Sequence, residues 1–117
     1  MLKISSRQRA AFRDDLVQRF EYQMCEHLRR DFPRARDASD AALARWIRGA
    51  THTATACGIV KGYDVRRFLE HCMSRGRGFI GIAPFAAILR DASLDGTRKM
   101  DIVDELDLFA EGPWRNG

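Results

Sequence analysis

Large apolar residues recur at every fourth position along the first third of the chain, separated by charged and polar residues. They are Phe12, Leu16, Phe20, Met24, Leu28 and Phe32. Side chains four residues apart lie on neighbouring turns of an α-helix, so the pattern predicts one long helix over residues 5–32. Because a step of four exceeds the helical repeat, the apolar stripe winds around this helix. We therefore expect different levels of the helix to face different parts of the fold.

A second amphipathic pattern covers residues 40–57. Its apolar residues recur at intervals of three and four, at Leu43, Trp46, Ile47, Ala50, Ala54 and Cys57. Ser39 is placed to cap the N-terminus of this helix, and Gly58 is placed to end it. The pattern predicts a second helix that buries one face.

Three further helices are predicted in the second half of the chain. The apolar spacing of residues 64–75 fits a helix that Gly76 ends. Pro84 suits the first turn of a short helix, and Asp95 is placed to cap a last helix over residues 97–110. No stretch shows the sustained alternation of a strand, so we predict an all-α fold. About five helices would form an orthogonal bundle around the long N-terminal helix.

Two segments between these helices are predicted to be irregular. Residues 33–38 are expected to be a polar connector, and residues 74–81, SRGRGFIG, a basic and glycine-rich loop. In this loop Gly76, Gly78 and Gly81 match the letters G-x-G-x-x-G. The dinucleotide-binding motif requires a strand before it and a helix directly after it, and neither is predicted here. The match therefore does not indicate a nucleotide site.

Length and composition are those of one ordinary domain. With 117 residues, 45% of them hydrophobic and 31% charged, the chain is predicted to be a single helical domain over residues 1–117. A charged helix follows the first residues where a secretory signal or a membrane span would need an apolar run. We expect a cytoplasmic protein that does not enter a membrane.

Charge is unevenly distributed along the sequence. The net charge of +4 combines 16 basic and 9 acidic residues in residues 1–77 with 4 basic and 7 acidic residues in residues 78–117. The two parts either attract each other within the fold or offer a charged surface to a partner. Since 17 of the 20 basic residues are arginine, an arginine-based nucleic-acid-binding protein is the alternative function. Binding of that kind weakens steeply as salt is added.

Catalytic and metal-binding motifs are not evident in the sequence. Cys25, Cys57 and Cys72 form no Cys-x-x-Cys pair, so we expect reduced thiols on apolar helix faces. The sequence contains no Gly-x-Ser-x-Gly, His-Glu-x-x-His or phosphate-binding loop. We therefore predict a protein that is not an enzyme and that needs neither metal nor cofactor.

An acidic face on the last predicted helix is the first candidate for a binding surface. No basic residue lies among the acids of this face. The face is solvated, packs against the arginines of the first helix, or forms a surface for a partner protein. The basic loop before the short helix is the second candidate. The candidate partner-binding residues are Asp101, Asp104, Glu105, Asp107, Arg75, Arg77 and Phe79.

Three segments together resemble a group of small helical proteins encoded in bacterial type VI secretion and polymorphic-toxin loci. These segments are RDDLVQRFEYQMCEHLRRDFP, GIVKGYDVRRFLEH and ILRDASLDGTRKMDIVDEL. The resemblance implies an accessory role as an adaptor, chaperone or immunity partner of a secreted effector. It implies no catalytic residue, and its expected partner is a protein encoded in the same locus.

Overall fold

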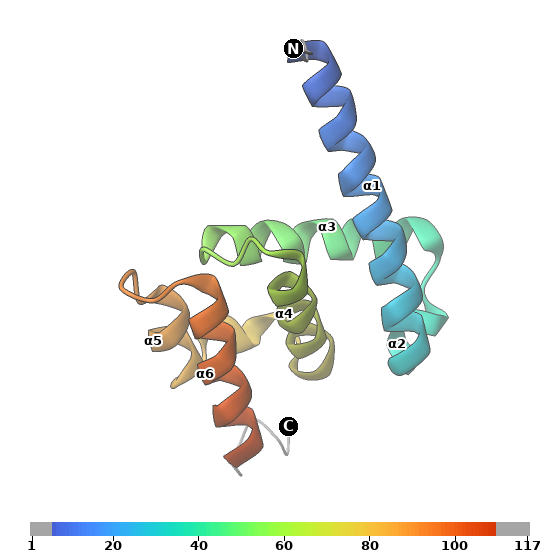
Figure 1. The fold of residues 1–117 in the computed structure, drawn as a ribbon. Coiled ribbons are helices and arrows are strands. Elements are labelled where there is room, and N and C mark those ends of the chain that lie inside the picture. The colour runs from blue at the N-terminus through green and yellow to red at the C-terminus, as the bar shows by residue number, and fades with distance from the viewer. Residues whose placement is uncertain (1–5, 110–117) are drawn as a thin grey trace. The chain divides into compact units, whose positions relative to one another are not determined.

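The computed structural model describes the backbone of residues 6–109 and the side chains of residues 15–76 and 78–108. This part of the chain is helical and contains no strand, so the all-α prediction is confirmed (Figure 1). None of its helices combines the length and the apolar character needed to cross a bilayer. The helices are α1 (Ser6–Asp31), α2 (Pro33–Asp37), α3 (Asp40–Ala56), α4 (Gly62–Arg75), the 3₁₀ helix η1 (Arg77–Gly81), α5 (Phe85–Arg90) and α6 (Gly96–Phe109).

The contacts divide the chain into two compact units. The first unit ends at Arg45 and the second begins at Trp46, so the division falls within α3. A compact unit is not by itself an independently folding domain. The single domain over residues 1–117 therefore stays a prediction.

In the first unit, α2 packs against the C-terminal part of α1. Residues 33–38 were predicted to be a connector, but Pro33–Asp37 form a short helix. Proline at the first helical turn favours this conformation, and Ala35 is only 1% exposed. Arg29 of α1 also binds the carbonyl oxygens of Ala35 and Ala38. These tertiary contacts stabilise a helix that the polar sequence of the segment does not indicate.

Burial along α1 is uneven. Met24 and Leu28 are buried, whereas Leu16 is 47% and Val17 49% exposed. All residues from 15 to 19 are exposed. The predicted apolar stripe is therefore buried near the C-terminus of α1 and open to solvent at Leu16. The side chain of Phe12, which belongs to the same stripe, lies outside the described residues.

In the second unit, η1 supplies the centre of the core. Phe79 of η1 is fully buried. The centroid of its ring lies 5.6 Å from the centroid of the Phe68 ring in α4 and 5.7 Å from the centroid of the Phe85 ring in α5. The glycine-rich segment was predicted to be a loop, but residues 77–81 form this 3₁₀ helix. Burial of the Phe79 ring between two helices accounts for the ordered turn.

The predicted helix boundaries mark the real ones closely. The Ser39 hydroxyl accepts a hydrogen bond from the amide of Ala42, and the Asp95 carboxylate accepts one from the amide of Arg98. Gly58 and Gly76 have φ values of +80° and +84°, a region that residues with a side chain rarely adopt. Both predicted caps and both predicted glycine ends are therefore confirmed.

The first turn of α6 docks directly on the turn between α3 and α4. A Cβ atom on Gly96 would lie 2.5 Å from the carbonyl oxygen of Gly58, so only glycine allows this approach. Lys99, three residues further along α6, adds polar contacts. The buried Lys99 ammonium donates to the carbonyl oxygens of Cys57 and Leu89, each at 2.8 Å. Lys99 thus binds carbonyls at the C-terminal ends of α3 and α5.

Candidate functional site

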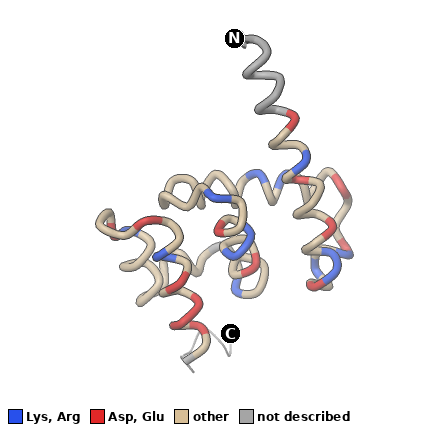
Figure 2. The backbone as a smooth tube through the Cα atoms, viewed as in Figure 1, with Lys and Arg blue, Asp and Glu red and all other residues tan. Residues whose placement is uncertain are grey.

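The acidic face of α6 lies against basic side chains of α4. Figure 2 shows acidic residues along α6. Arg67 Nη2 of α4 donates to Asp101 Oδ1 at 2.9 Å and to Asp104 Oδ2 at 2.7 Å. Arg67 Nε donates to the same Asp104 oxygen at 2.9 Å. The α4 guanidinium therefore holds two successive carboxylates of α6.

The same pairing continues toward the C-terminal ends of both helices. His71 Nε2 lies 2.7 Å from Asp104 Oδ1, and Arg75 forms an ion pair with Asp107. The three basic residues are spaced four apart on α4, and the three acids are spaced three apart on α6. Each spacing keeps its side chains on one helix face, so the two rows face each other. We call these six residues the α4–α6 ladder: Arg67, His71, Arg75, Asp101, Asp104 and Asp107.

Asp64 closes the N-terminal end of the ladder. It is 2% exposed and accepts hydrogen bonds from Thr97 Oγ1 at 2.5 Å and from Arg67 Nη1 at 3.2 Å. Burial lowers the pKa of Arg67, but hydrogen bonds from its guanidinium to Asp104, Asp101 and Asp64 outweigh burial and raise this pKa above its usual value. The guanidinium therefore stays charged and binds the three carboxylates together.

These contacts assign a structural role to the ladder. A carboxylate that binds a histidine ring can orient it for proton transfer. Here Asp104 also accepts two hydrogen bonds from Arg67, so its charge is shared between two basic groups. His71 is 8% exposed and its ring lies 5.9 Å from that of the buried Phe79. The cluster ties α4 to α6 beside the core.

The predicted partner-binding residues have different surroundings. Three acids of the α6 face pair with α4, whereas Glu105 is exposed. Arg75 pairs with Asp107, and its guanidinium lies 5.4 Å from the centre of the Phe85 ring. Phe79 is a core residue with no exposed surface, and the side chain of Arg77 lies outside the described residues.

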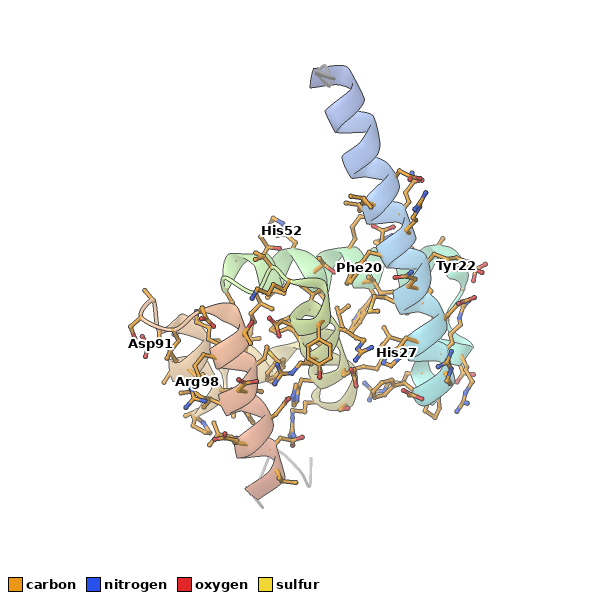
Figure 3. The ribbon with its side chains drawn as sticks, viewed as in Figure 1. Phe20, Tyr22, His27, His52, Asp91 and Arg98 are labelled. Atoms are coloured by element: carbon orange, nitrogen blue, oxygen red, sulfur yellow. The ribbon has the colours of Figure 1, made fainter. Side chains whose placement is uncertain are left out.

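A concave surface lies elsewhere, within the first unit. It is a cleft of about 440 Å³ along α1 and the start of α3. We call it the α1 cleft, and it is lined by Gln18, Glu21, Tyr22, Cys25, Glu26, Arg29, Asp40 and Ala44. Figure 3 labels Tyr22 on α1, where its side chain is 66% exposed. One feature of the sequence indicates this surface, because residues 18, 22, 25 and 29 share one helix face.

Among the described side chains, Arg29 is the basic residue that lines the α1 cleft. Its Nε donates to the carbonyl oxygen of Ala35 at 3.2 Å, and its Nη2 donates to that of Ala38 at 2.8 Å. Its Nη1 contacts Asp40 Oδ1 at 2.5 Å. All three nitrogens of the guanidinium are therefore used within the unit. Arg29 fastens α1 to α2 and to the start of α3.

Two further groups of the α1 cleft stay neutral near pH 7. A hydrogen bond and the negative charge of Glu26 raise the pKa of Tyr22. Burial raises the pKa of the Cys25 thiol. The charged residues that line the cleft are then three acids, at positions 21, 26 and 40, and one arginine.

No protein-family model matches the sequence, and neither a curated protein nor a solved structure matches the chain. Function is therefore argued from the described residues. The sequence prediction missed Arg67 and His71 as partners of the acids, although their spacing with Arg75 gives α4 a basic row. It also missed the α1 cleft, whose shape depends on how the chain after α1 folds back.

Proposed function

We propose that the chain is a non-enzymatic protein that binds another protein, and that its binding surface is the α1 cleft with the exposed residues beside it. One observation carries the proposal: large apolar side chains are exposed next to a concave surface. Tyr22 is 66% exposed and lines the cleft, and Val17, 49% exposed, lies one helical turn before Glu21. Tyrosine is enriched at protein interfaces because its ring has both a large apolar surface and a polar group.

The charge arrangement also supports a surface on α1 over one on α6. Carboxylates of the α4–α6 ladder already bind arginine and histidine, so a partner would have to break those contacts before using them. At the α1 cleft, Arg29 is held in place by contacts within its own unit, and the side chain of Tyr22 is open to solvent and needs no rearrangement to be reached. Surfaces that bind without rearrangement give the higher affinity for a given contact area.

The partner class follows from the sequence resemblance. Segments of α1, α4 and α6 resemble accessory proteins of type VI secretion and polymorphic-toxin loci. We propose an adaptor, chaperone or immunity partner of a secreted bacterial effector, with the partner encoded beside this chain. The resemblance thus supports the class of partner, whereas the α1 cleft supports the place where that partner binds.

Co-expression with each adjacent gene product tests the proposed function. The tagged full chain is captured and then separated by size-exclusion chromatography, with an unrelated helical protein under the same tag as control. We expect one adjacent product to elute together with the chain as a stoichiometric complex. If none of the adjacent products is retained, the proposed function is wrong.

A further inference from the structure

We infer that the α1 cleft receives an apolar side chain carried on a helix of the partner protein. This inference rests on the proposed function and adds the chemistry by which the partner is recognised. Three observations in the first unit support it. The charged groups of the cleft already have partners, an exposed ring stands in the cleft beside small uncharged side chains, and an exposed apolar residue follows at its edge.

The charged side chains that line the cleft are engaged within the chain. The Tyr22 hydroxyl donates a hydrogen bond to the Glu26 carboxylate. Arg29 pairs with Asp40 and binds two backbone carbonyl oxygens, and Glu21 has an interaction partner as well. A charged group that enters the cleft would lose its water and would have to displace one of these contacts. The charge arrangement therefore favours an occupant that is uncharged.

Uncharged groups supply the surface that such an occupant covers. Tyr22 is 66% exposed, and Cys25 and Ala44 line the cleft along α1 and the start of α3. A hydrogen bond to Glu26 raises the pKa of Tyr22, and burial raises the pKa of Cys25, so both groups are neutral near pH 7. Removal of the exposed ring from water on binding is favourable in proportion to the apolar area covered.

The apolar surface continues along α1 beyond the cleft. Val17 is 49% exposed and precedes Glu21, a lining residue, by one helical turn. It lies on the face of α1 that is buried further along, at Met24 and Leu28. An occupant that fills the cleft and also covers Val17 extends the buried face of α1 toward its N-terminus.

A helix is the form of partner segment that fits this surface. The part of the chain that the structure describes contains no strand, so it offers no sheet edge to which an extended segment could add. A helix satisfies its own backbone and presents apolar side chains three and four residues apart to a groove. Residues 18–29 of α1 span about 17 Å, which matches about three turns of a partner helix.

A titration of the full chain with small probes tests the inference without the partner. The probe is N-acetyl-leucine amide, followed by amide chemical shifts in two-dimensional NMR, and the control probe is N-acetyl-arginine amide. We expect saturable shifts over residues 17–29 with the leucine probe and weaker shifts with the arginine probe. The absence of shifts with the leucine probe, or an equal response to the arginine probe, would overturn the inference. Leucine-induced shifts as large at Val60 and Tyr63, two exposed residues of the second unit, would overturn it too.

A charge placed in the cleft tests the same point. Ala44 lines the cleft, and Ala44→Glu should weaken binding of the leucine probe about tenfold, because an apolar occupant would bury the new carboxylate. Ala41→Glu is the matched control, because Ala41 is exposed on α3 three residues before the lining residue, and it should leave binding unchanged. Equal binding by the two variants would overturn the inference. If Ala44→Glu does not fold, the comparison of the two probes on the unchanged chain decides.

The complex separates this inference from the proposed function. A co-purified partner should bind the Ala44→Glu variant about tenfold more weakly and the Ala41→Glu variant as before. Its affinity should fall little as salt is added, because apolar contacts are not screened. A partner that binds both variants equally, or that loses affinity steeply with salt, would overturn the inference and leave the proposed function standing.

The oligomeric state of the chain alone tests a different occupant. We expect a monomer by sedimentation velocity. A dimer that Ala44→Glu dissociates and Ala41→Glu does not would place a second copy of the chain in the cleft and overturn the inference. Failure to find any partner contradicts the proposed function, while the probe titration still tests the cleft.

Discussion

Replacing Lys99 by methionine should destabilise the second unit strongly. Lys99 is 5% exposed, and its ammonium donates two hydrogen bonds of 2.8 Å to the carbonyl oxygens of Cys57 and Leu89. Methionine has a similar length and fits the same space but cannot donate. The variant therefore leaves two carbonyls at helix C-terminal ends without this donor, in a region that water reaches poorly.

The expected loss follows from those two hydrogen bonds. A hydrogen bond to a charged group contributes about 1.5–3 kcal/mol to stability. The variant also no longer pays the desolvation cost of a buried ammonium, which offsets part of the loss from the two hydrogen bonds. We expect a net loss of about 3 kcal/mol in the free energy of unfolding. With an m-value of about 1.5 kcal/mol/M in urea, the midpoint should fall by about 2 M.

Urea unfolding followed by circular dichroism measures this change. Arg98→Met is the matched control, because Arg98 is the preceding residue of α6, has the same charge and is exposed. Its midpoint should stay within about 0.3 M of the unchanged chain, since exposed substitutions change stability by about 0.5 kcal/mol or less. If Lys99→Met also unfolds within that margin, the reasoning about its two carbonyl partners is wrong.

Three further predictions concern the two units. Arg67→Met should lower the free energy of unfolding by about 3 kcal/mol, because it leaves three carboxylates facing each other. Arg66→Met removes a more exposed ion pair and should lower the free energy of unfolding by less than about 0.5 kcal/mol. Equal urea midpoints for the two variants would contradict the role of the ladder. Gly96→Ala should cost about 2 kcal/mol because its Cβ meets backbone, while Gly78→Ala, with open space around it, should be tolerated; thermal melting compares the two. Burial raises the pKa of Cys25, so less thiolate is present at pH 8 than in an unfolded chain. Iodoacetamide should therefore alkylate Cys25 more slowly in the folded protein than in the unfolded chain, as measured by mass spectrometry of the Cys25 peptide. Equal alkylation rates would refute the raised pKa.

Local signals were sufficient to place most helices from the sequence. Ser39 and Asp95 cap helices through their own side chains, and Gly58 and Gly76 end helices through their own backbone conformation. Such signals act over a few residues, so a sequence displays them directly. This is why the bounds of α3 and α6 agree with the predicted ones to within a residue.

Tertiary contacts explain what the sequence did not show. Pro33–Asp37 became a helix because Ala35 packs against α1 and Arg29 binds the end of the segment. Residues 77–81 became a 3₁₀ helix because the Phe79 ring enters the core. In both segments local propensity favoured an irregular structure, and burial of one side chain decided otherwise.

The candidate site depended even more on distant contacts. The acids of α6 were visible as a row, but the sequence did not reveal that Arg67, 34 and 37 residues earlier, binds Asp101 and Asp104. The α1 cleft brings Asp40 next to residues of α1, which also requires the chain to fold back after Asp31. Charge patterns identify such groups, whereas the fold decides which of them meet.

Hydrogen–deuterium exchange of the purified complex tests most directly whether α1, and not the acidic face of α6, is the binding surface. The full chain is compared with and without its co-purified partner, under the same buffer and labelling times. We expect added protection over residues 17–29 on binding and unchanged exchange over residues 99–108. Added protection confined to residues 99–108 would contradict the account, because it would place the partner on carboxylates that α4 already binds.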